Sequence, residues 1–119
     1  MRESGEMYLE TILVLQKKLR KVRAIDVVQE LGYSKPSVSR AFGKLKAADC
    51  VSVDEDGYVT LKEKGKEIAE RIYERHVILS QMLMRMGVDE KTALEDACKI
   101  EHDLSEETFQ IIKARLSRK

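Results

Sequence analysis

Residues 24–45, AIDVVQELGYSKPSVSRAFGKL, contain two short segments of apolar periodicity separated by a glycine turn. In the first segment, 24–31, a predicted helix carries three apolar residues on one side: Ile25, Val28 and Leu31. Gly32 is typical of the position just after a helix. Ser34 is a suitable N-cap for a second helix, with Pro36 in its first turn, where a missing N–H costs little. Two short helices joined in this way predict a helix-turn-helix.

The segment that follows extends this prediction to a winged helix. The second helix is expected to bury Val38, Phe42 and Leu45, and two β-prone runs, 51–53 and 58–61, come next. The turn-forming residues between these runs predict a hairpin with an acidic tip: Asp54, Glu55, Asp56 and Gly57. An acidic wing tip is a poor candidate for phosphate contact. Cys50, just before the hairpin, is expected to be a core residue.

The remaining segments are predicted to be helical. A first helix covers 3–18, with an apolar stripe of Leu9, Ile12, Leu15 and Leu19. A long helix is expected over 62–85, a helix capped by Asp89 over 90–102, and a last one, capped by Ser105, over 106–116. The predicted fold class is mostly α: a winged-helix domain, 1–66, and a helical domain, 67–119.

Composition excludes several classes of protein. Apolar residues make up 43% of the 119 residues and charged residues 36%, and the apolar runs are too short to span a bilayer. The first residues lack the pattern of a signal peptide. Two cysteines do not make a disulfide framework, and a reducing cytoplasm is the expected compartment.

A cluster of possible metal ligands lies in the predicted helix over 90–102. Cys98, Glu101 and His102 stand at i, i+3 and i+4, which would place a thiolate, a carboxylate and an imidazole on one face. Those donor types suit a transition metal. The alternative is a buried cysteine beside ordinary surface charges, and for an isolated motif of this kind that alternative is the more common one.

Six segments, in this order and at this spacing over nearly the whole chain, are similar to those of a known family: 6–12 (EMYLETI), 34–40 (SKPSVSR), 61–66 (LKEKGK), 75–76 (RH), 87–89 (GVD) and 96–105 (DACKIEHDLS). The chain resembles the diphtheria-toxin-repressor family of metal-dependent transcriptional regulators, which includes the manganese transport regulators. The SH3-like domain of many members has no room in 119 residues, so the resemblance is to a short form.

The resemblance implies a metal site. Four residues match the primary ligands of the iron-responsive branch: Met7, Cys98, Glu101 and His102. Glu10 and His76 match further ligands of the manganese-responsive branch, which has Asp in place of Met7 and Glu in place of Cys98. Because thioether and thiolate are soft donors, Fe²⁺ is favoured over Mn²⁺, with Co²⁺, Ni²⁺ or Zn²⁺ possible in vitro. Ser80 and Leu94 stand where the iron branch has two ancillary ligands.

The resemblance also implies a homodimeric repressor of metal-uptake genes that binds a palindromic double-stranded DNA operator. The expected DNA-binding residues are Ser34, Pro36, Ser37, Ser39, Arg40 and Lys44. One ion held by both domains would fix the angle between them, and hence the spacing of the two recognition helices.

Two rival functions are open at this point. One is a metal-independent winged-helix regulator with a structural Cys98. The other is an enzyme with Cys98 as nucleophile and His102 as base, which is disfavoured because the sequence shows no orienting group or oxyanion-hole loop.

Overall fold

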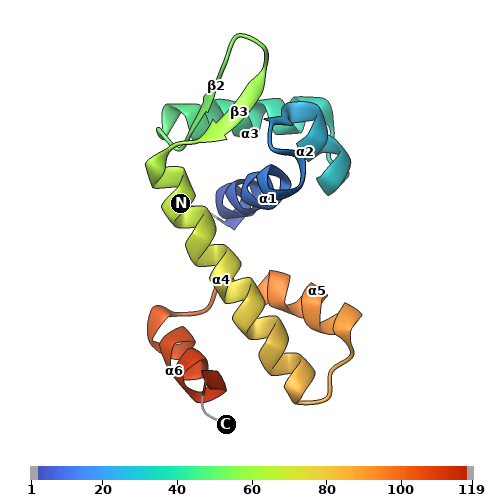
Figure 1. Cartoon of the computed structure of the whole chain (residues 1–119), viewed down its shortest axis with the longest axis vertical. Helices are drawn as coiled ribbons and strands as arrows, with labels where there is room; N and C mark the ends of the chain where they lie inside the picture. The colour runs from blue at the N-terminus through green and yellow to red at the C-terminus, as the bar shows by residue number, and fades with distance from the viewer. Residues whose placement is uncertain (1–2, 118–119) are drawn as a thin grey trace. The chain divides into compact units, whose positions relative to one another are not determined.

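The computed structural model describes residues 3–117, and the chain divides into two compact units, Met1–Glu70 and Arg71–Lys119. Over the described residues the chain forms six helices and a small three-stranded sheet (Figure 1). This architecture confirms the predicted fold class, a winged helix-turn-helix followed by a helical segment.

Three helices form the core of the first unit: α1 (Glu3–Leu19), α2 (Ala24–Leu31) and α3 (Lys35–Ala47). The predicted core residues of α3 are buried, as are Leu9, Ile12 and Leu15 of α1. The Ser34 cap and the Gly32 C-cap, in the left-handed conformation with φ 71°, are also confirmed. Sequence periodicity therefore located the helix-turn-helix correctly.

Two predicted core residues of the first unit are instead exposed. Leu19 is 48% exposed because it is the last residue of α1, where Arg20 turns the chain with φ 68°. Ile25 is 38% exposed, and Val27 is the fully buried residue of α2. A short strand directly before α2 sets the orientation of that helix, so the apolar spacing within α2 alone does not decide which side faces the core.

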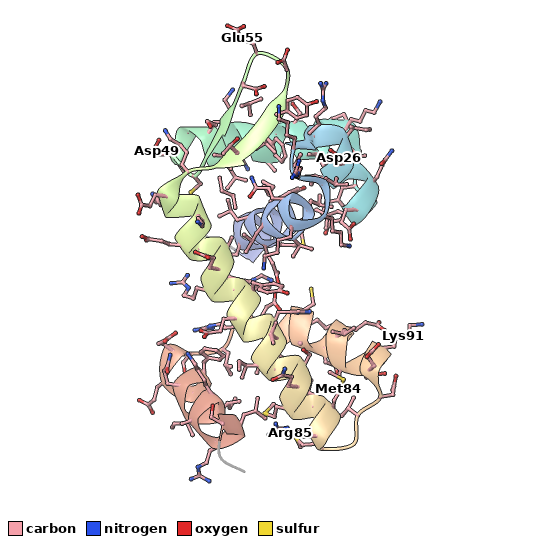
Figure 2. The ribbon with its side chains drawn as sticks, viewed as in Figure 1. Asp26, Asp49, Glu55, Met84, Arg85 and Lys91 are labelled. Atoms are coloured by element: carbon pink, nitrogen blue, oxygen red, sulfur yellow. The ribbon has the colours of Figure 1, made fainter. Side chains whose placement is uncertain are left out.

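That strand, β1 (Val22–Arg23), was not predicted, because two residues are too few to show alternation. It pairs with β3 (Tyr58–Leu61), which also pairs with β2 (Val51–Val53), and both pairings are antiparallel. The β2–β3 hairpin confirms the predicted wing. Its tip carries Glu55, labelled at the end of the hairpin in Figure 2.

The hairpin leads directly into α4 (Glu63–Arg85) through a tight contact. Cys50 is fully buried, as predicted, and a Cβ on Gly65 would lie 2.1 Å from the Cys50 carbonyl oxygen. Position 65 therefore requires glycine for the first turn of α4 to lie against the segment before β2.

The second unit consists of the later part of α4 with α5 (Glu90–Ile100) and α6 (Glu106–Ser117), which lie on opposite sides of α4 (Figure 1). Buried apolar residues from all three helices form its core: Ile72, Leu79, Ala93, Ala97 and Phe109. Asp89 and Ser105 accept hydrogen bonds from the backbone of Thr92 and Thr108, which confirms both predicted caps. Within residues 3–117 there is no helix with the length and apolarity needed to cross a membrane.

The helix predicted over 90–102 is shorter in the structure. It ends at Ile100, and Glu101 and His102 lie in the turn that leads to Ser105. The backbone N–H groups of Asp103 and Leu104 both return to the Ile100 carbonyl, which closes the helix. Glu101 is the C-cap of α5 and keeps a helical backbone, with its N–H bonded to the Ala97 carbonyl, so Cys98 and Glu101 retain helical spacing and His102 lies beyond the helix.

Candidate metal centre and DNA-binding surface

The predicted DNA-binding residues lie at the first half of α3. Ser34, Pro36, Ser39, Arg40 and Lys44 are exposed, and Ser37 is half-buried. Ser34 Oγ accepts the Ser37 N–H at 3.2 Å, and the Arg40 guanidinium donates to Ser37 Oγ at 3.4 Å. The start of the helix is thus ordered by short polar side chains, while the arginine stays available to a ligand.

A second basic cluster lies beside Tyr58, the first residue of β3 after the wing tip. The Arg23 guanidinium lies 4.3 Å, and the Lys21 amine 5.1 Å, from the centre of the Tyr58 ring. Cation–π contacts of this kind hold two positive charges on the sheet. No sequence pattern indicated these contacts, because Tyr58 lies on a strand 35 residues away from Arg23.

The second unit brings together three of the six predicted metal ligands. Glu101 is fully buried, and its Oε1 lies 2.8 Å from His76 Nδ1. The other carboxylate oxygen, Oε2, lies 3.5 Å from His102 Nε2, and the His102 side chain is only 2% exposed. A carboxylate taken out of water in this way needs compensating positive charge.

The hydrogen bonding of Glu101 fits a bound cation. Its Oε2 atom is buried and accepts no hydrogen bond within the described residues. The 3.5 Å to His102 Nε2 is long for a hydrogen bond, whereas two ligands of one ion, each bonded at about 2.1 Å, lie roughly 3 to 3.5 Å apart. Because carboxylate and imidazole are donors that divalent transition metals accept, the residues fit such an ion.

Arg75 holds the turn that carries two of these ligands. It is 7% exposed, and its guanidinium donates to the backbone oxygens of Glu101, at 3.1 Å, and of Leu104. It also donates to Glu106 Oε1 at 3.0 Å, in the first turn of α6. Hydrogen bonds from Gln110 and from Arg75 hold the pKa of Glu106 below its usual value. The segment 75–76 was part of the family resemblance, but nothing in the sequence indicated that Arg75 holds this turn.

The other predicted ligands lie elsewhere. Cys98 is exposed on α5, about one turn before the buried C-cap residue Glu101. Met7 and Glu10 are half-buried on α1, in the first unit, and their approach to the ligands of the second unit stays a prediction. Ser80 and Leu94 stand where the iron branch has two ancillary ligands. In the structure Ser80 Oγ donates to the His76 carbonyl at 2.7 Å, and Leu94 is 39% exposed.

The chain matches known proteins over both units. Residues 1–66 match the N-terminal DNA binding domain of iron dependent repressors, and residues 62–118 match their metal binding and dimerisation domain. An uncharacterised HTH-type transcriptional regulator of Methanocaldococcus jannaschii is 35% identical over 115 residues, which are 95% of this chain and 92% of that protein. The transcriptional regulator MntR of Escherichia coli O157:H7 is 30% identical over 112 residues, 94% of this chain and 72% of that protein.

Solved structures are also similar. The manganese regulator SloR has a TM-score of 0.85 and 25% identity, over 97% of this chain and 54% of that one. A manganese-dependent transcriptional repressor in complex with manganese has a TM-score of 0.86 and 26% identity, over 94% of this chain and 52% of that one. The chain therefore spans about half the length of these two solved regulators.

Proposed function

The chain belongs to the iron-dependent repressor family, whose members are transcriptional regulators and not enzymes, and from this premise we propose that it is a metal-activated repressor that binds DNA as a homodimer. The observation that carries the proposal is the buried carboxylate of Glu101, which lies between His76 and His102 and has an oxygen without a hydrogen bond. A buried acceptor of this kind is costly unless a cation binds there.

We assign six residues to the metal site. His76, Glu101 and His102 form its buried part in the second unit, and we propose that Cys98 joins them from α5 and that Met7 and Glu10 complete the site from α1. The ion would supply the positive charge that these donors lack. Arg75 holds the Glu101–Leu104 turn through two backbone oxygens, so the Glu101 carboxylate and the His102 ring are oriented before an ion binds.

Ligands drawn from two units would make metal binding depend on how the units are arranged. An ion that binds one arrangement more tightly than the others shifts the population toward it. If that arrangement spaces the two α3 helices of a dimer for successive major-groove faces, metal and operator bind with positive coupling. In this proposal Arg40 reads a guanine edge, while Lys44 and the basic residues Lys21 and Arg23 contact phosphates.

Fe²⁺ is the metal that we propose. Manganese is named for SloR and for the second solved repressor, both of which resemble this chain. The donors proposed here include the thioether of Met7 and the thiol of Cys98, whereas Mn²⁺ prefers carboxylate and other oxygen ligands. The choice between Fe²⁺ and Mn²⁺ therefore depends on whether these two sulfur atoms bind the ion.

A DNA-binding titration tests the proposal. Operator sites are selected from a random duplex library with the wild-type protein, and affinity is then measured by fluorescence anisotropy in chelator and with Fe²⁺, Mn²⁺ or Zn²⁺, without oxygen. We expect each activating metal to raise affinity at least about tenfold, which is the range of ordinary allosteric coupling. Cys98→Ala should weaken activation by Fe²⁺ more than activation by Mn²⁺.

Lys99→Ala, at the exposed neighbouring residue of α5, is the matched control and should behave as wild type. DNA affinity that is the same in chelator and in metal would favour the metal-independent regulator. Equal Fe²⁺ activation of wild type and Cys98→Ala would remove Cys98 from the site.

A further inference from the structure

A contact in the first unit joins a proposed metal ligand to the helix-turn-helix. The Tyr33 hydroxyl donates to Met7 Sδ at 3.7 Å, which is within hydrogen-bonding reach because sulfur is larger than oxygen. Tyr33 lies in the turn between α2 and α3, and Met7 lies on α1. The two residues are 26 positions apart in sequence, so only the fold brings them together.

The Tyr33 ring is held in place by a second aromatic ring. Its centroid lies 6.1 Å from that of Tyr8, at an interplanar angle of 67°. Tyr8 is only 6% exposed, so it offers Tyr33 a fixed partner. Burial raises the pKa of Tyr8, Tyr33 raises it further and the Arg40 guanidinium lowers it. The phenol of Tyr8 is thus close enough to Tyr33 and to Arg40 of α3 to be affected by both.

The backbone of Tyr33 leads directly into the cap of α3. The next residue, Ser34, accepts the Ser37 N–H and so fixes the first turn of α3. A displacement of Tyr33 would therefore be passed to the cap and to the residues that we assign to DNA.

We propose that Tyr33 is a positioning residue that couples the metal ligand Met7 to the start of the recognition helix. Its hydroxyl occupies one of the two lone pairs of the Met7 sulfur and leaves the other for the ion. Metal bound to Met7 then restrains Tyr33, and an α3 that is ordered on DNA restrains Met7. Because such coupling is reciprocal, Tyr33 should contribute equally to the effect of metal on DNA affinity and of DNA on metal affinity.

The inference rests on the proposed function, but the contact itself can be tested without metal. Met7→Leu should change the tyrosine ultraviolet absorption of the metal-free protein, because the phenol loses its acceptor. The same substitution in a Tyr33→Phe background should leave the absorption unchanged. A spectrum that does not respond to Met7→Leu, or responds equally in both backgrounds, would overturn the inference.

The coupling is tested by the ratio of DNA affinities with and without Fe²⁺. Tyr33→Phe keeps the ring next to Tyr8 and removes only the hydroxyl, so that ratio should fall about two- to fivefold, the effect of one weak hydrogen bond. Thr60→Val, which removes a hydroxyl at an exposed position of β3, should leave the ratio as in wild type. Thermal melting in chelator verifies that both variants fold.

The outcomes separate the two proposals. A wild-type protein without a metal response would remove the proposed function and this inference with it. A responsive wild type whose ratio is retained in Tyr33→Phe would remove the inference alone.

Discussion

The DNA-binding surface and the metal centre place their functional side chains in opposite environments. In the first unit, the proposed DNA contacts of α3 are exposed, while Val38, Phe42 and Leu45 of the same helix form the core. In the second unit, Glu101 is a proposed ligand and is also fully buried. The first unit thus carries its proposed functional residues on the surface, and the second carries one in its interior.

This difference has an energetic consequence. An exposed arginine or serine contributes little to the free energy of folding, so the proposed DNA-binding residues of α3 can be substituted with little change in stability. A buried carboxylate whose Oε2 accepts no hydrogen bond lowers the stability of the metal-free protein. The proposed metal centre is therefore expected to raise metal affinity while it lowers the stability of the metal-free protein. The exposed DNA-binding residues of α3 are expected to have no such effect on stability.

The largest expected effect is that of Glu101→Gln. An amide has nearly the same shape but no charge, so metal affinity should fall at least about 100-fold, since second-layer partners alone are worth about 10- to 100-fold. The free energy of unfolding in chelator should rise by about 1 kcal/mol, because a buried charge is removed. Metal titration calorimetry and urea denaturation measure the two effects.

Glu95→Gln, the same change at an exposed position of α5, should alter neither quantity. A loss of stability of Glu101→Gln in chelator would contradict this difference between the two units, because Glu101 would then stabilise the metal-free fold.

Arg40→Ala tests the other side of the comparison. Loss of one base-reading arginine should weaken binding to the selected operator by about 1 to 3 kcal/mol. Stability should change by less than about 0.5 kcal/mol, because the side chain is exposed, and metal affinity in the absence of DNA should not change. Anisotropy titration and urea denaturation give these values.

Arg85→Ala, the same substitution at an exposed arginine of α4, should leave DNA affinity close to that of wild type. Equal losses in the two variants would mean that Arg40 acts only through net charge and reads no base.

The same contrast explains what the sequence could predict. Apolar periodicity and capping residues were sufficient to predict the helix-turn-helix. Gly32 ends its first helix and Ser34 caps the second, and most of its core residues follow helical spacing. The resemblance predicted Glu101 and His102 as ligands, and the structure brings them together with His76. Local pattern extended the helix too far, to His102. Glu101 is instead the C-cap of α5, and its carbonyl accepts a hydrogen bond from Arg75, 26 residues earlier. The two-residue β1 and the Tyr33–Met7 contact also depend on partners distant in sequence.

The smallest expected effect concerns the support of the metal-binding turn. Gln110 and Arg75 lower the pKa of Glu106 from its usual value of 4.5, so the stability that this carboxylate contributes is present above pH 4.5 and is lost as the pH falls through its lower folded value. Glu106→Gln should therefore lower the melting temperature in chelator at pH 7, by about 2 °C or less because the side chain is 60% exposed, and should match wild type at the acid end.

Glu107→Gln, exposed in the same turn, controls for the loss of a negative charge at the start of α6. A Glu106 variant that differs from wild type by the same amount at every pH would show that the carboxylate contributes packing and not charge. Support for the turn would then rest on the backbone contacts of Arg75 alone.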